Sequence, residues 1–139
     1  MAGPTCECRP VSAATVAILV LLSGAAGALL RFGISRALPV AARPHAVPRA
    51  VLIVNVVGSF LAGVGLALTQ TDTIPAAVGL VIITGLCGGL TTFSTFAVES
   101  VELFMQGKAR VAARSLVLNF VLGVGAATVG YLPTLLLAF

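Results

Sequence analysis

The chain has 139 residues, of which 59% are hydrophobic and 9% are charged, and its mean hydropathy is +1.15. A water-soluble domain of this length needs far more charge to cover its surface, so the composition excludes a soluble protein and indicates a membrane protein. The net charge is +4, but the basic residues stand singly at the ends of apolar runs, which is typical of membrane anchoring and argues against a nucleic-acid partner.

A bilayer-spanning helix needs roughly 20 apolar residues, and the chain divides into four runs of about this length. Residues 1–12 are polar and contain two prolines, so we expect a disordered N-terminal tail followed by a transmembrane domain at 13–139. The four predicted spans are residues 13–30, 50–68, 76–104 and 115–139. Arg31 and Arg36 are expected to end the first span, and a basic segment at 105–114 to connect the last two. The predicted fold is therefore an all-α membrane protein with four transmembrane helices.

The first span has a second interpretation. Arg9, a short apolar core and the small residues at 23–28 resemble a signal peptide with its cleavage site. The apolar run continues through Leu30, which is longer than most signal cores. We therefore expect this segment to be a transmembrane helix.

Small residues recur four positions apart in the first two spans, as Ser23 with Gly27 and Ser59 with Gly63. Helices in lipid associate through close backbone contact, and small residues at this spacing mark the faces that meet. Glycine is also common in membrane helices without such a role. Taken together, the pairs predict where the first two helices pack.

The third span contains the segment GLCGGLTTFSTF at 85–96, in which three glycines precede four hydroxyl residues. Glycine weakens a helix, and serine and threonine compete for its backbone hydrogen bonds. The segment therefore predicts either a glycine-rich packing kink or a helix that is broken in the middle. In a broken helix the freed carbonyl groups would face inward and could hold a cation, and the N-terminus of the second half would attract an anion.

Phe93 and Phe96 share one face of this segment, and Thr92, Thr95 and Glu99 form a neighbouring stripe. The edge of an aromatic ring is positive, so two rings placed side-on can stabilise an anion that has lost water. Phenylalanine in a membrane helix is also commonly a lipid-facing or core residue. Both interpretations of the two rings stay open at this point.

Glu99 is a carboxylate within a membrane span, where charge is costly and often functional. Arg31 is expected at the same membrane depth, because the first and third spans run in the same direction. The two side chains can form an ion pair, with either a structural or a transport role. Asn55 in the second span can donate to an anion or to another helix, and so can Asn119 in the fourth, one turn after Ser115.

Three motifs stand in order along the chain: GAAGALLR at 24–31, NVVGSF at 55–60 and GLCGGLTTFSTF at 85–96. Together they resemble the CrcB/Fluc fluoride channels over nearly the whole chain from about Ala14 onward. The resemblance implies a four-helix subunit of the cell membrane that assembles as an antiparallel dimer with two pores. It also implies that fluoride leaves the cell passively through these pores.

The resemblance assigns roles to matching residues. The backbone carbonyls of Gly88 and Thr91, from both subunits, would hold a structural Na+ ion at the centre of the dimer. Phe93 and Phe96 would flank the fluoride path, and Asn55 would be a donor that lines the pore.

In the second half of the third span, Ser94, Thr95 and Glu99 match the polar stretch of the family's third helix. On the fourth helix this chain departs from the family, which often has serine at the position of Asn119 and tyrosine at that of Ser115. The hydrogen bonding near that part of the pore is therefore left open.

The charges also predict an orientation. The loops after the first and third spans share one side of the membrane, and that side has seven basic residues against one on the other. Such a bias predicts both termini outside and the basic loops in the cytoplasm. A subunit that inserts both ways should show little bias. The dimer would therefore be either a homodimer or, as the bias favours, a heterodimer with an oppositely oriented paralogue.

Two other functions fit a small membrane protein. A small multidrug-resistance transporter would need a carboxylate in its first helix, and this chain has none there. A non-transporting assembly subunit would explain the packing glycines but not the polar segment at 85–96. The sequence contains no nucleotide motif and no catalytic constellation, so we do not expect an enzyme.

Overall fold

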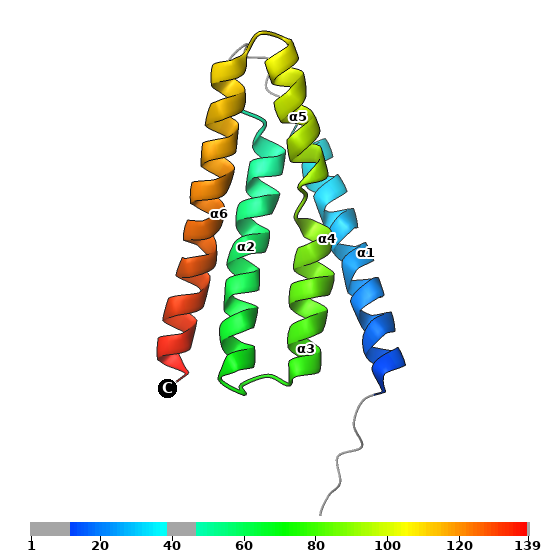
Figure 1. The fold of residues 1–139 in the computed structure, drawn as a ribbon. Helices are drawn as coiled ribbons and strands as arrows, with labels where there is room; N and C mark the ends of the chain where they lie inside the picture. The colour runs from blue at the N-terminus through cyan, green and yellow to red at the C-terminus, as the bar shows by residue number, and fades with distance from the viewer. Residues whose placement is uncertain (1–11, 39–46, 139) are drawn as a thin grey trace, which may run out of the picture.

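The computed structural model describes residues 12–38 and 47–138, and within these residues every regular element is a helix. In chain order the elements are α1 (Ala13–Ala37), α2 (Arg49–Gln70), α3 (Ala76–Leu80), the π-helix η1 (Val81–Cys87), α4 (Gly88–Leu90), α5 (Ser94–Met105) and α6 (Ala109–Leu137) (Figure 1). Four segments are long and apolar enough to cross a membrane, namely α1, α2, Ala76–Met105 and α6. The chain is a multi-pass membrane protein, as its composition predicted.

The predicted N-terminal tail lies outside the described residues except for its last residue. Ser12 caps α1, because its Oγ accepts a hydrogen bond of 3.2 Å from the backbone nitrogen of Thr15. This bond satisfies one of the N–H groups that the first turn of any helix leaves free. The first span therefore begins at the predicted position.

Two helices extend further than the sequence predicted on the side that carries the basic residues. The prediction ended the first span before Arg31, but α1 continues to Ala37. The fourth helix begins at Ala109, inside the segment that was predicted to be a connection. Arginine and alanine are good helix formers, and arginine can place its charge in the interface while its stem stays on the helix. The basic residues therefore indicate where these helices leave the membrane rather than where they end.

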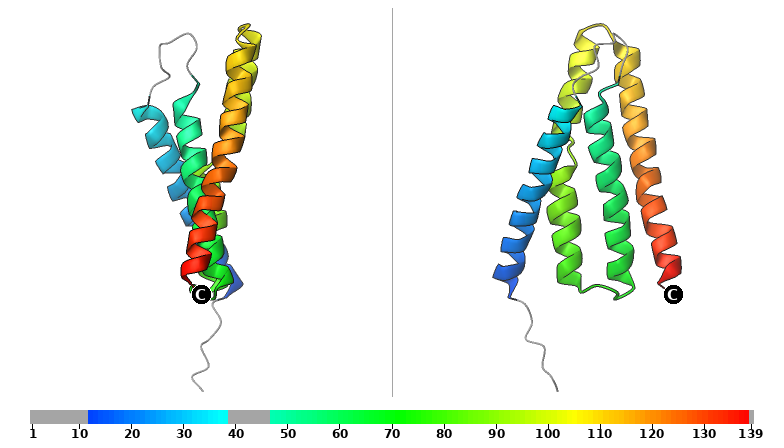
Figure 2. Two further views of the ribbon diagram at one scale, coloured as in Figure 1. Left: turned by 90° about the vertical axis from the view of Figure 1, so that its left-hand side faces the viewer. Right: turned by 180° about the vertical axis from the view of Figure 1, so that it is seen from behind.

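The helices lie side by side in the order α6, α2, the α3–α4 segment and α1 (Figure 1). α2 packs along α6, while α1 packs against η1 and α4. Beyond α4, the third span changes direction and α5 packs on α6. Seen edge-on, in the left view of Figure 2, the molecule is narrow at the α2–α3 turn and separates into two arms at the other end. In the plane of Figure 1, by contrast, α1 and α6 are furthest apart at the α2–α3 turn. One arm is the C-terminal half of α1 with the start of α2, and the other is α5 with the start of α6.

Backbone contact, rather than large side chains, holds α1 on the third span. Gly27 is the buried residue of α1, and a β-carbon there would collide with the backbone of the third span. A β-carbon at Gly89 would likewise meet the carbonyl oxygen of Gly24. Ser23 Oγ donates a hydrogen bond of 3.0 Å to the carbonyl oxygen of Val81. The packing face predicted from Ser23 and Gly27 is confirmed.

The second predicted face, on α2, is also a helix contact. Gly63 is buried, and its nearest neighbours are the backbone atoms of Ala127 on α6. Of the predicted pair Ser59 and Gly63, only Gly63 makes this close contact. Ser59 lies one turn earlier on α2 and is half-buried. Small residues thus bring α2 and α6 together as predicted.

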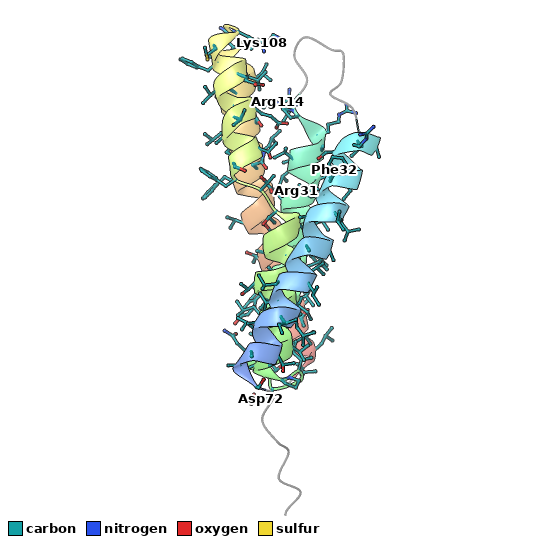
Figure 3. All side chains as sticks on the ribbon, turned by 90° about the vertical axis from the view of Figure 1, so that its right-hand side faces the viewer. Arg31, Phe32, Asp72, Lys108 and Arg114 are labelled. Atoms are coloured by element: carbon teal, nitrogen blue, oxygen red, sulfur yellow. The ribbon has the colours of Figure 1, made fainter. Side chains whose placement is uncertain are left out.

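Basic side chains gather at the end where the arms separate. Figure 3 shows Lys108 and Arg114 on one arm and Arg31 on the other, with Asp72 at the opposite end of the molecule. The described residues at the narrow end, around the α2–α3 turn, include no lysine or arginine. The prediction that the loops after the first and third spans share one side is therefore confirmed for the described part of the chain.

Candidate functional site

The third span is broken between Leu90 and Ser94, which confirms the predicted discontinuous helix. Between α4 and α5, Thr91 is extended, with φ −74° and ψ 157°. The N–H group and the hydroxyl of Thr91 both donate to the carbonyl oxygen of Cys87, each at 2.9 Å. The first half of the span therefore ends in a closed turn, and the chain starts a new helix three residues later.

Asn55 of α2 replaces helical hydrogen bonds that are missing at the break. Its Oδ1 accepts a bond of 2.8 Å from Thr92 N, and its Nδ2 donates a bond of 3.2 Å to Thr92 O. In a continuous helix the Thr92 N–H would donate to the carbonyl oxygen of Gly88 instead. The Asn55 side chain thus satisfies both backbone groups of Thr92, which is itself buried.

The amide of Asn55 also binds Asn119 of α6. Its Nδ2 lies 3.0 Å from Asn119 Oδ1, and Asn119 Nδ2 donates a bond of 3.0 Å to the carbonyl oxygen of Ser115. Because Thr92 N–H can bond only to the oxygen of Asn55, this contact fixes the orientation of both amides. Both hydrogens of the Asn55 amide are engaged within the subunit. Its predicted contact with an anion therefore stays a prediction, whereas its role in holding the break is visible in these bonds.

The first turn of α5 carries a cluster of hydroxyl groups and free N–H groups. Thr92 Oγ1 accepts a bond of 3.2 Å from Thr95 N, and it lies 3.1 Å from Thr95 Oγ1 and 3.3 Å from Ser94 Oγ. The N–H groups of Ser94 and Phe96 have no acceptor among the described residues. This turn is also the positive end of the helix dipole. It is consequently a place where negative charge is favoured.

The carbonyl groups of four residues at the break, Gly88, Gly89, Leu90 and Thr91, are left without donors in the described part of the chain. The Gly88 carbonyl has lost the Thr92 N–H to Asn55, and the Thr91 carbonyl has lost the Thr95 N–H to a hydroxyl. Gly88 is exposed on the subunit and Thr91 is half-buried. Free carbonyl oxygens are ligands of the type that hard cations take. The two residues assigned to a cation by resemblance therefore have the chemistry to hold one.

A groove holding about 560 Å³ runs past the break between α2, α5 and α6. The residues along it include Asn55, Ser59, Thr92, Phe93, Phe96 and Asn119. The ring centroids of Phe93 and Phe96 lie 6.1 Å apart at an interplanar angle of 52°. Phe93 is 80% exposed, so no part of the described subunit covers it. The groove thus combines three aromatic rings, those of Phe93, Phe96 and Phe120, with two amides and the start of a helix.

Ser94, Thr95 and Glu99 lie on α5, next to the lining of this groove rather than in it. Ser94 and Thr95 are exposed and join the hydroxyl cluster, while Glu99 is half-buried. Their predicted place along a fluoride path stays a prediction.

The predicted ion pair between Arg31 and Glu99 is not formed within the described subunit. α5 carries a second carboxylate, Glu102, one turn further along the helix. The prediction assumed that the first and third spans stay parallel. After the break, however, α5 leaves α1 and packs on α6, so the two side chains belong to different arms (Figures 2 and 3). Arg31 instead lies half-buried beside the opening between the arms.

The π-helix that precedes the break was not predicted. η1 contains a wider turn than an α-helix, and such turns are often found at functional sites. The hydroxyl of Ser23 binds the carbonyl oxygen of Val81, the first residue of η1. The one available signal was Ser23, on the predicted packing face of the first span. It predicted a contact with another helix but not the wider turn.

These features define the class of protein. It is a small multi-pass membrane protein in which an interrupted helix exposes backbone groups inside the bilayer, beside a groove lined with polar and aromatic side chains. Irregular backbone at membrane depth is tolerated where it lines a cavity or a binding site. This arrangement is typical of channels and transporters.

Comparison with known proteins gives the family. Residues 18–131 match the family described as "CrcB-like protein, Camphor Resistance (CrcB)", and the chain belongs to this family. It is 45% identical to Fluoride-specific ion channel FluC 1 of Yersinia pseudotuberculosis over 103 residues, which cover 73% of this chain and 80% of the relative. It is 39% identical to Fluoride-specific ion channel FluC of Renibacterium salmoninarum over 120 residues, or 83% of this chain and 95% of the relative.

A third relative has the same name. Fluoride-specific ion channel FluC of Deinococcus radiodurans is 43% identical over 110 residues, which cover 78% of this chain and 86% of the relative. The family inferred from the three motifs is therefore confirmed. These relatives are named as ion channels and not as enzymes.

Proposed function

We propose that this chain is a fluoride-selective ion channel that lowers cytoplasmic fluoride by letting the ion leave the cell passively. The observation that carries the proposal is the groove at the break, where Phe93, Phe96 and the start of α5 meet the amides of α2 and α6. The names of the relatives supply the identity of the ion.

The groove has the chemistry that fluoride needs. Fluoride is small and strongly hydrated, so a pore must replace its water with donors and positive groups. The ring edges of Phe93 and Phe96 are positive, and the free N–H groups at Ser94 and Phe96 are donors. In a low dielectric these groups act more strongly on the ion than they would in water. The hydroxyls of Ser94 and Thr95 and the Glu99 carboxyl would continue the path along α5.

A second subunit would complete the site. In a single subunit the groove is open, Phe93 is 80% exposed and the carbonyl groups at the break lack donors. Free backbone groups inside a bilayer need a partner. An antiparallel dimer would cover the break with its own symmetry-related surface and would form two pores. Arg31 would then stand in the vestibule between the arms.

The dimer would hold a structural Na+ ion through the carbonyl oxygens of Gly88 and Thr91 from both subunits. Replacing Na+ by N-methylglucamine at constant ionic strength is expected to cost about 2–3 kcal/mol of stability, because a ligand present at roughly 100 times its dissociation constant contributes this much. Thermal unfolding of the detergent-solubilised protein measures the loss. Equal melting curves in the two salts would contradict a bound Na+ ion.

The partner would be either a second copy of this chain or an oppositely oriented paralogue. The described basic residues lie at the end where the arms separate: Arg31, Arg36, Arg49, Lys108, Arg110 and Arg114. This bias favours one orientation of the chain, with the arms on the cytoplasmic side. A partner in the opposite orientation is then more simply supplied by a paralogue with the opposite bias.

Phe93→Ile and Phe96→Ile are each expected to lower fluoride efflux from liposomes by at least about tenfold, because an aliphatic side chain has no positive edge. Phe104→Ile is the matched control, since Phe104 lies on the same helix, is 68% exposed and does not line the groove. A fluoride-selective electrode measures the efflux. If the groove variants conducted as well as the Phe104 variant, the groove would not be the fluoride path.

A further inference from the structure

Ser59 is a hydroxyl residue of the groove. The sequence predicted a helix contact for it, but the close contact is made by Gly63, and the bonds at the break do not involve Ser59. It lies one helical turn after Asn55 on α2, and it lines the groove. Its hydroxyl makes no hydrogen bond in the described part of the chain, whereas the hydroxyls of Thr69, Ser100, Thr128 and Thr134 each bond to a carbonyl oxygen one turn earlier. The groove therefore contains a donor that the protein itself does not use.

The facing surface of α6 leaves room in front of this hydroxyl. Ser115, Asn119 and Gly123 follow one another at intervals of four residues, so they share one face of α6. The last of these residues, Gly123, has no side chain, and a β-carbon there would lie 3.6 Å from Ser59 Oγ. The hydroxyl of Ser59 therefore lies next to the Gly123 position, at a distance that is ordinary van der Waals contact for a β-carbon.

Asn119 supplies a second free donor. Its Oδ1 accepts from Asn55, and one amide hydrogen goes to the carbonyl oxygen of Ser115. The amide has two hydrogens, so one is left without an acceptor in the described residues. Asn119 and Ser59 both line the groove, from opposite helices. An anion that enters here would meet donors from both sides.

We propose that the Ser59 hydroxyl and the free amide hydrogen of Asn119 form a second fluoride-binding position, one turn from the break toward the narrow end. The inference rests on the proposed function, because it extends the path of the same ion. Ser59 then binds the ion directly, one turn beyond the Asn55 amide that holds the break. A dehydrated anion would pass from the phenylalanine edges to these two donors.

The test compares fluoride efflux from liposomes for Ser59→Ala, Ser59→Thr and the control Ser35→Ala. Ser35 is an exposed serine of α1 that does not line the groove. A hydrogen bond to a charged group corresponds to about a tenfold effect. Ser59→Ala is expected to lower efflux about tenfold, and to raise about tenfold the fluoride concentration that gives half-maximal thermal stabilisation. Ser59→Thr keeps the hydroxyl and should restore both values, while Ser35→Ala should change neither.

Three results would overturn the inference. Unchanged efflux in Ser59→Ala would show that the hydroxyl does not contact the ion. Equal losses in the alanine and threonine variants would assign Ser59 to helix packing. Wild-type protein that passes no fluoride, either alone or together with a paralogue of opposite charge bias, would refute the proposed function and this extension with it. That outcome is distinct because it appears before any variant is measured.

Discussion

Asn55→Ala is expected to lower the free energy of unfolding by about 2–4 kcal/mol and to abolish most fluoride efflux. The variant leaves both the N–H and the C=O of the buried Thr92 without their partner. Each unsatisfied buried group costs about 1–3 kcal/mol. Without this support, the break would close into a continuous helix or lose its fixed geometry. Thermal unfolding in detergent and efflux from liposomes measure the two effects.

Asn119→Ala provides the comparison for stability. It removes one bond to Asn55 but leaves both bonds between Asn55 and Thr92 in place. Its cost is expected to be about 1 kcal/mol. The informative result is therefore which of the two variants loses more free energy of unfolding. An Asn55→Ala protein as stable as Asn119→Ala would mean that the break does not depend on Asn55.

Gly89→Ala is the second variant with a large expected effect. The new β-carbon would meet the carbonyl oxygen of Gly24 on α1, and neither backbone can move away without separating the helices. α1 has few other means of attachment, because Gly27 is its buried residue. Overpacking of this kind costs about 1–3 kcal/mol or more. We expect a fall in the thermal unfolding temperature and loss of efflux, since α1 supports the segment that leads into the break.

Gly125→Ala is the matched control. A β-carbon at Gly125, on α6, would have no neighbour within 4 Å. Alanine is the better helix former, so this variant should be neutral or more stable by up to about 1 kcal/mol. If both variants unfolded at the wild-type temperature, close backbone contact would not be what holds α1 in place.

Much of the fold follows from the sequence because a bilayer limits the choices. Four apolar runs predicted the four spans, and three glycines followed by hydroxyl residues predicted the break at the right place. The ends of the helices were predicted less well. A charged residue marks the membrane surface, but a helix such as α1 can continue into water beyond it.

The candidate site was predicted in its residues but not in its bonds. Sequence alone left open whether Asn55 binds an anion or another helix, and only the contacts with Thr92 and Asn119 distinguish these roles within the subunit. The change of direction after the break could not be predicted, because local composition does not fix the angle between half-helices. This change of direction separates Arg31 from Glu99.

Fluoride efflux from liposomes is the measurement that tests the assigned function most directly. The purified chain would be reconstituted alone and, in parallel, together with a paralogue of opposite charge bias. Fluoride should leave at least one of the two preparations rapidly while chloride is retained, and efflux only with the paralogue would identify the dimer as a heterodimer. If neither preparation released fluoride, or if chloride left as fast, this chain would not be a fluoride channel.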